Sequence, residues 1–248
     1  MNQEHKPRET PPASDAPDMQ EYGAPKDGVR QASGKRLFMQ LLVYTDCFQT
    51  GPVVSALQRS GLECVLYADL NDPRGIGVLL LSEEPAVFSG KARLLLSSKP
   101  FSSLKARSGM TMIGRTYSLG YEQDLEDWLL RKPRRNVFNP ELSWAVWYPL
   151  RRKPEFEQLS KDEQRTVLME HGKIGMGYGQ ADLAHDIRLA CHGLDAQDNE
   201  FLLGLVGKEL HPLSRLVQDM RKTQQTSRYI QQMGPFFVGH VLGRFPKK

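Results

Sequence analysis

The order of structural segments repeats once along this chain, and that repetition limits the fold more than any other feature. Residues 35–119 carry four apolar runs typical of strands and two segments with helical spacing, in the order β-α-β-β-α-β. Residues 144–245 carry the same order again. Two copies of a split β-α-β unit predict an α+β fold with two antiparallel four-stranded sheets. Each sheet is expected to carry helices on one face and to pack against the other sheet through its uncovered face.

The segments outside the two repeats differ in composition. Residues 1–34 are rich in Pro, Ser, Asp, Glu and Lys and hold almost no large apolar side chains, so we predict a disordered tail. Residues 120–143 connect the repeats. This connector includes a short helical segment from Leu125 to Arg131, with a basic cluster after it.

Composition excludes several classes of protein. The 248 residues include 33 basic and 29 acidic side chains, a net charge of +4, without the basic stripes of a dedicated nucleic-acid binder. No run of 18 apolar residues and no apolar leader are found, which argues against a membrane span and a secretory signal. Three cysteines without a CxxC pair form neither a disulfide framework nor a usual zinc site. We therefore expect a soluble, cytoplasmic, globular protein.

One helix of the second repeat is well defined by its sequence. Ser160 and Glu163 form a capping box at its start, and Gly172 is expected to end it directly after His171. The glycine-rich run 172–179 follows a helix instead of opening one, so we predict a flexible link and not a phosphate-binding loop.

His171 occupies the most informative position among the histidines. It ends an inner stripe formed with Gln164, Val167 and Leu168, which directs its imidazole toward the apolar side of the helix. It could interact only with the helix dipole, as a histidine in a last turn often does. Alternatively, it could be an axial ligand to haem iron, for which one histidine in an apolar pocket is sufficient.

Tyr148 lies near the end of the first strand of the second repeat, shortly after Trp144 and Trp147. Core packing would account for these aromatic side chains, and a redox-active or proton-relaying phenol is the functional alternative. Basic residues flank this strand and are either solvated charges or groups that recognise carboxylates. They are Arg134, Arg135, Arg151, Arg152 and Lys153.

Short motifs of the second repeat occur in an order and spacing that resemble one known family. The motifs are WAVWYPL at 144–150, EHGKIG at 170–175, GLD at 193–195, DNEF at 198–201, RKT at 221–223 and GPFFVG at 234–239. This pattern is similar to that of the chlorite dismutase-like haem proteins, and within them of the coproheme decarboxylases. The family fold is two tandem ferredoxin-like repeats of the dimeric αβ-barrel type packed as one unit, in agreement with the repeat described above.

The resemblance implies a haem-binding oxidoreductase of haem biosynthesis. Coproheme decarboxylases use hydrogen peroxide to convert iron coproporphyrin III into haem b, as two propionates become vinyl groups and carbon dioxide is lost twice. His171 corresponds to the family's iron ligand, and Tyr148 to the tyrosine thought to abstract hydrogen from the propionate. Members usually form homopentameric rings, and the ferrochelatase of the preceding step is a candidate partner.

The resemblance also implies contacts with the propionates. Arg152 stands where the family has a lysine near the reacting propionate. Thr226 stands near a hydroxyl residue that holds a propionate. Arg134 and Arg135 are alternative candidates for a propionate-binding arginine, because the loop length differs from that of the family.

Two positions of the family pattern differ here. Chlorite dismutases carry a distal arginine before the Gly-Leu-Asp turn, and the place falls on Asp186 or Arg188, which share one face of the strand while His185 takes the other. Chlorite dismutases also hold the iron-ligating histidine with a glutamate. The corresponding place is near Val206, which cannot accept a hydrogen bond from imidazole. This difference favours the decarboxylase over the chlorite dismutase.

Three functions follow as alternatives. The first is a coproheme decarboxylase in which Tyr148 is catalytic. The second is a haem-dependent peroxidase or chlorite dismutase-like enzyme in which Arg188 is catalytic and Tyr148 only packs. The third, from another class, is a haem-binding protein without catalysis, since a shared fold does not fix a function.

Overall fold

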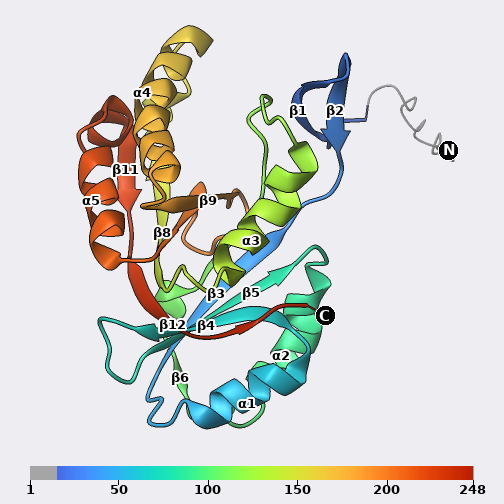
Figure 1. The fold of residues 1–248 in the computed structure, drawn as a ribbon, viewed down its shortest axis with the longest axis vertical. Coiled ribbons are helices and arrows are strands. Elements are labelled where there is room, and N and C mark those ends of the chain that lie inside the picture. The colour runs from blue at the N-terminus through green and yellow to red at the C-terminus, as the bar shows by residue number, and fades with distance from the viewer. Residues whose placement is uncertain (1–15, 248) are drawn as a thin grey trace, which may run out of the picture.

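The computed structural model of the chain describes residues 16–247 (Figure 1). Both repeats contain the expected elements, and the α+β prediction is confirmed. The first repeat comprises β3 (Phe38–Thr45), α1 (Gly51–Ser60), β4 (Glu63–Asp69), β5 (Ile76–Ser82), α2 (Arg93–Leu96) and β7 (Met112–Arg115). The second comprises β8 (Trp144–Arg152), α4 (Lys161–Gln180), β9 (His185–Ala190), β10 (Phe201–Gly207), α5 (Leu210–Met220) and β12 (Phe237–Phe245).

Shorter elements complete the repeats and the connector. Two short strands add to the sheet, β6 (Lys105–Ala106) beside β3 and β11 (Ile230–Met233) beside β8. The connector forms one helical segment, η5 (Asp127–Arg131) followed by α3 (Lys132–Phe138), so the expected helix also includes the basic cluster. The remaining helical turns are η2 (Phe88–Ala92), η3 (Phe101–Ser103), η4 (Ser108–Met110), η6 (Pro154–Phe156) and η7 (Gln225–Tyr229).

The strands of the two repeats form one closed barrel. Each repeat has the strand order of a ferredoxin-like sheet, β7-β3-β5-β4 in the first and β12-β8-β10-β9 in the second. The sheets join edge to edge: β4 pairs with β12, and β7 meets β9 through Arg115 and Ala190. The uncovered faces of the two sheets pack together inside the barrel, as expected, but the sheets are joined at their edges and are not separate. Pairing the sheet edges satisfies backbone groups that separate sheets would leave exposed.

Alternation along the strands separates the interior of the barrel from its outer surface. Trp147 points inward, is fully buried and lies over Gly204 of the neighbouring strand. Val146, Tyr148 and Leu150 point outward into an apolar layer beneath α4 and α5. The outer surface of the first sheet is covered in the same way by α1 and α2 (Figure 1).

Helix α4 is longer than the sequence indicated. The predicted capping box is present, with Ser160 Oγ accepting from the Glu163 backbone N–H. The helix does not end at Gly172 but continues through the glycine-rich run to Gln180, so the predicted flexible link is wrong. None of these glycines has a left-handed conformation, and packing of Ile174 and Tyr178 on the apolar layer offsets their low helix propensity.

The predicted disordered tail is also corrected in part. Residues 1–15 lie outside the described residues, but β1 (Glu21–Lys26) and β2 (Val29–Ser33) form an antiparallel hairpin. Asp27 and Gly28 both have positive φ, 52° and 79°, as the two-residue turn of a tight hairpin requires. The Gln31 side-chain amide donates to the carbonyl of Glu122 and fastens the hairpin to the connector.

Between residues 16 and 247, none of the helices combines the length and apolar character needed to traverse a bilayer.

Gly204 is expected to be essential for packing inside the barrel. A Cβ at this position would clash with the indole ring of Trp147, so Gly204→Ala should lower the free energy of unfolding by about 1–3 kcal/mol. The matched control is Gly177→Ala on the exposed side of α4, where no atom lies within 4 Å of the added Cβ. This control should raise stability by about 0.5–1 kcal/mol. Urea unfolding measures both changes, and equal stability of the two variants would contradict the packing described.

Candidate functional site

Three of the predicted site residues project from the outer surface of the second sheet. Leu203 of β10 pairs with Tyr148 on one side and with Arg188 on the other. Tyr148 and Arg188 therefore lie in one row of this surface, and Asp186 lies in the next row beside Leu205. Helix α4 packs on this surface through Ile174 and Tyr178. His171 of the same helix lies close enough to Arg188 and Asp186 for their charges to act on its pKa.

The contacts of His171 fix which ring nitrogen carries the proton. Its Nδ1 lies 3.3 Å from Oγ1 of the buried Thr223. That hydroxyl donates its single proton to the carbonyl of Met220, at 2.7 Å. Because the proton is used there, Oγ1 accepts a hydrogen bond from Nδ1–H. The lone pair of His171 therefore lies on Nε2.

The surroundings of His171 keep its imidazole neutral. Burial, assisted by the positive charge of Arg188, lowers its pKa from the ordinary 6.5 to about 4. A neutral imidazole with a free Nε2 is the form that binds a metal ion. The interpretation of His171 as a simple partner of the helix dipole requires a charged ring and does not fit this environment.

Thr223 was not assigned a role from the sequence, although it belongs to the Arg-Lys-Thr motif. Val206, expected near His171, instead points into the interior of the barrel with Ala145 and Ile187. The strand alternation therefore excludes Val206 from the site. A hydroxyl from the segment after α5 contacts the imidazole in its place.

Tyr148 is both a packing residue and a buried phenol. Only 5% of it is exposed, and its ring stacks on Phe236 with the centroids 4.6 Å apart. Burial raises the pKa of its hydroxyl well above the usual range. Among residues 16–247, no hydrogen bond to this hydroxyl is found. The phenol is thus protonated and available to a ligand on this surface.

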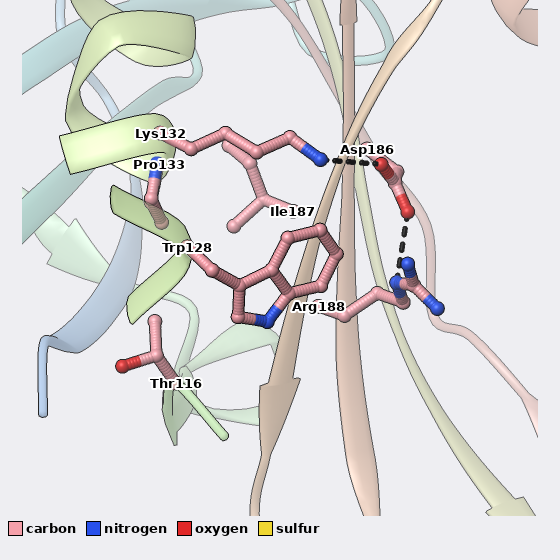
Figure 2. A pocket seen from close by; sticks show the side chains of 7 residues that line it. All are labelled: Thr116, Trp128, Lys132, Pro133, Asp186, Ile187 and Arg188. Atoms are coloured by element: carbon pink, nitrogen blue, oxygen red, sulfur yellow. Dashed lines mark ion pairs between the residues drawn. The ribbon is translucent and has the colours of Figure 1, made fainter. Parts of the chain in front are cut away.

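Asp186 is shared by two cations that come from different parts of the chain (Figure 2). Its Oδ2 lies 2.8 Å from Nε of Arg188, and its Oδ1 lies 3.6 Å from Nζ of Lys132 on α3. Burial tends to raise the pKa of Asp186, but the two cations outweigh this effect and hold it below the ordinary value. The ring of Trp128 contacts both cations, 4.2 Å from Lys132 Nζ and 5.1 Å from Arg188 Cζ.

Lys132 and Trp128 were not predicted as site residues. Both belong to the connector helix, which borders β9 and lines a small pocket with Asp186 and Arg188 (Figure 2). The basic cluster of the connector was visible in the sequence, but nothing in the pattern indicates which of its cations faces β9.

Two arginines predicted to bind propionates point elsewhere. Arg134 forms a two-pronged pair with Glu63 and also contacts Glu83, at 3.1 Å. Arg135 pairs with Asp127, at 2.8 Å. These carboxylates occupy both guanidinium groups, so the structure does not bring Arg134 or Arg135 together with His171.

Arg152 and Thr226 lie on the same side of the repeat as the site. Arg152 projects outward from the end of β8, pairs with Glu200 and Glu157, and lies over two aromatic rings. Thr226 Oγ1 lies 3.4 Å from Oγ1 of Thr223.

The residues around His171 fit a flat macrocycle that carries a metal ion. Nε2 provides one neutral nitrogen ligand, as an axial position requires. At Gly172, beside His171, no atom lies within 4 Å of the place where a Cβ would stand. The sheet opposite supplies an apolar surface with the phenol of Tyr148 and the cation of Arg188 at its edge.

The fold is a duplicated ferredoxin-like barrel of the α+β class, and comparisons with known proteins find a family that matches its second part. The family model described as chlorite dismutase matches residues 130–242. This region, which is less than half of the chain, is similar to the chlorite dismutase family.

Two curated relatives match parts of the chain. A coproheme decarboxylase of Mycolicibacterium smegmatis is 32% identical over 93 residues, which are 37% of this chain and 37% of the relative. A protein of Haloarcula marismortui named as heme-binding is 26% identical over 144 residues, 55% of this chain and 20% of the relative. The chain thus spans well under half the length of either.

Solved structures share the fold. A protein named as a chlorite dismutase, TA0507, superposes with a TM-score of 0.65 at 14% identity, over 85% of this chain and 96% of its own. A heme-binding protein from Thermus thermophilus has the same TM-score at 19% identity, over 84% of this chain and 92% of its own. These likenesses support the ferredoxin-like barrel.

The depressed pKa of His171 predicts a pH dependence of stability. The unfolded chain binds a proton near pH 6.5 and the folded chain only near pH 4, so the free energy of unfolding should fall as the pH drops through this window. His171→Asn should flatten that slope, whereas His211→Gln, at an exposed position, is the matched control. Urea unfolding between pH 4 and 7 measures the slope, and an unchanged slope in His171→Asn would contradict the buried neutral imidazole.

Proposed function

We propose that the chain binds iron porphyrin through His171 and catalyses the peroxide-dependent oxidative decarboxylation of iron coproporphyrin III to haem b. The observation that carries this proposal is the placement of a neutral His171 and a buried, protonated Tyr148 at one surface of the second sheet. The names of the Mycolicibacterium and Haloarcula relatives, a coproheme decarboxylase and a heme-binding protein, support it.

His171 and Thr223 would hold the porphyrin iron. Nε2 of His171 is the ligand atom, and the Thr223 hydroxyl fixes the tautomer and the direction of the ring. A neutral hydroxyl leaves less negative charge on the imidazole than a glutamate would, which favours decarboxylation over strong peroxidase chemistry. When bound, the iron porphyrin supplies the redox chemistry with hydrogen peroxide.

Tyr148 is the proposed residue that abstracts hydrogen from the propionate. Its raised pKa keeps the O–H bond intact at neutral pH, and stacking on Phe236 limits movement of the ring. The overall reaction balances for each propionic acid group: one hydrogen peroxide is consumed, one vinyl group and one carbon dioxide form, and two water molecules are released. Arg152 and Thr226 remain the proposed contacts with the carboxylates.

Arg188 favours a second candidate function, a haem-dependent peroxidase or chlorite dismutase-like enzyme. Its guanidinium lies in the same row as Tyr148, where it could stabilise negative charge on an oxidant. In that enzyme Tyr148 would only pack. A homopentameric ring and a ferrochelatase partner stay predictions.

Tyr148→Phe should separate the two functions. Full-length protein is mixed with iron coproporphyrin III, binding is recorded as a Soret shift, and hydrogen peroxide is added while mass spectrometry follows the loss of carboxyl groups. We expect two successive losses with the natural chain and a rate at least about a hundredfold lower with Tyr148→Phe, because the hydroxyl group that takes hydrogen from the propionate is removed. The shift itself should be retained.

Two variants control this experiment. Tyr44→Phe makes the same change in the core of the first repeat and should decarboxylate at the natural rate. The His171→Ala variant should show no Soret shift when it is mixed with iron coproporphyrin III. Full decarboxylation by Tyr148→Phe would refute the role of the phenol, and bleaching of the pigment without decarboxylation by the natural chain would favour the peroxidase.

A further inference from the structure

The carboxylate of Asp186 is divided between two cations, which is unusual for an arginine–aspartate pair. An isolated carboxylate commonly binds a guanidinium with both oxygens in a parallel fork. Here Oδ1 is held on the Lys132 side and only Oδ2 contacts Arg188 (Figure 2). Lys132 belongs to the connector helix, whereas Asp186 and Arg188 belong to the second repeat.

Arg188 retains its capacity to donate hydrogen bonds. Its buried Nε is 2.8 Å from Asp186 Oδ2, but its N–H is not aligned with that oxygen and has no hydrogen-bond partner. Within residues 16–247, none of the guanidinium N–H groups of Arg188 makes an aligned hydrogen bond. The side chain is held by charge and by its contact with the Trp128 ring.

The geometry points to Lys132 and Trp128 as positioning residues that keep the guanidinium of Arg188 free to donate hydrogen bonds to a peroxide oxygen at the outer surface of the second sheet. Lys132 holds one oxygen of Asp186, so the carboxylate cannot form a fork with Arg188. Trp128 lies against both cations, and its Nε1 donates to the Tyr117 carbonyl, at 2.9 Å, which fixes the indole.

This arrangement makes the connector part of the site. Removal of Lys132 leaves both oxygens of Asp186 to Arg188, and the resulting fork consumes two of its donors. The identity of the ligand, hydrogen peroxide, rests on the proposed function. The arrangement of the three charged side chains does not, because it exists in the protein without porphyrin.

Arginine NMR of the porphyrin-free, full-length protein tests the arrangement. With ¹⁵N-labelled arginine, the Arg188 signal is assigned by its loss in Arg188→Lys. We expect fast hydrogen exchange at Arg188 in the natural chain and slowed Nε–H and Nη–H exchange in Lys132→Met, where the fork forms. The double variant Lys132→Met with Asp186→Asn should exchange fast again, and Lys132→Arg should behave as the natural chain.

Lys208→Met is the matched control, because Lys208 also contacts two carboxylates, those of Asp182 and Glu141, away from the site. Lys208→Met should leave the hydrogen exchange of the Arg188 guanidinium unchanged. In porphyrin-loaded protein, Lys132→Met should raise KM for hydrogen peroxide about tenfold, with kcat nearly constant, since charge-assisted hydrogen bonds to the ligand are lost.

The two proposals fail in different ways. Unchanged exchange at Arg188 in Lys132→Met, or slowed exchange already in the natural chain, would overturn the positioning role. Failure of the proposed function would appear instead as no Soret shift when the natural chain is mixed with iron coproporphyrin III, while the exchange at Arg188 still responds to Lys132→Met.

Discussion

Alternation along β8 is the constraint on which the site depends. Closure of the barrel turns one face of every strand inward, where apolar side chains such as Trp147 fill the interior. Tyr148, the next residue, must then project outward beneath the covering helices. A shift of one residue in the pairing register of β8 would exchange the positions of Trp147 and Tyr148. The phenol would then lie in the core, and the indole would face the site. The packed barrel therefore fixes the position of the reactive side chain.

Burial between α4 and the outer surface of the second sheet determines the charge of each group. It keeps His171 and Tyr148 neutral, because neither has an opposite charge close enough to offset the loss of water. Asp186 stays ionised on the same surface, since Lys132 and Arg188 both contact its carboxylate. The surface thus combines a neutral imidazole, a protonated phenol and a cation with free donors, which is the set that the proposed binding of an iron porphyrin and an oxidant requires.

The sequence was sufficient for the repeat and the capping box, because these depend on local patterns. The roles of His171 and Tyr148 stay predictions that rest on short motifs. The sequence was insufficient where tertiary contacts decide. The glycine-rich end of α4 is helical because neighbouring side chains pack on the sheet, and the hairpin at Asp27–Gly28 was hidden by the polar composition around it. The contribution of Lys132 depends on how the connector meets β9, which no periodicity within either segment specifies.

The central claim is that iron porphyrin binds between α4 and the outer surface of the second sheet, with the free nitrogen of His171 on the iron. A crystal structure of the protein with iron coproporphyrin III tests it most directly. The account predicts electron density for a bond from His171 Nε2 to iron, with the Tyr148 hydroxyl beside a propionate. A porphyrin bound at another surface, or iron ligated by a side chain other than His171, would contradict it.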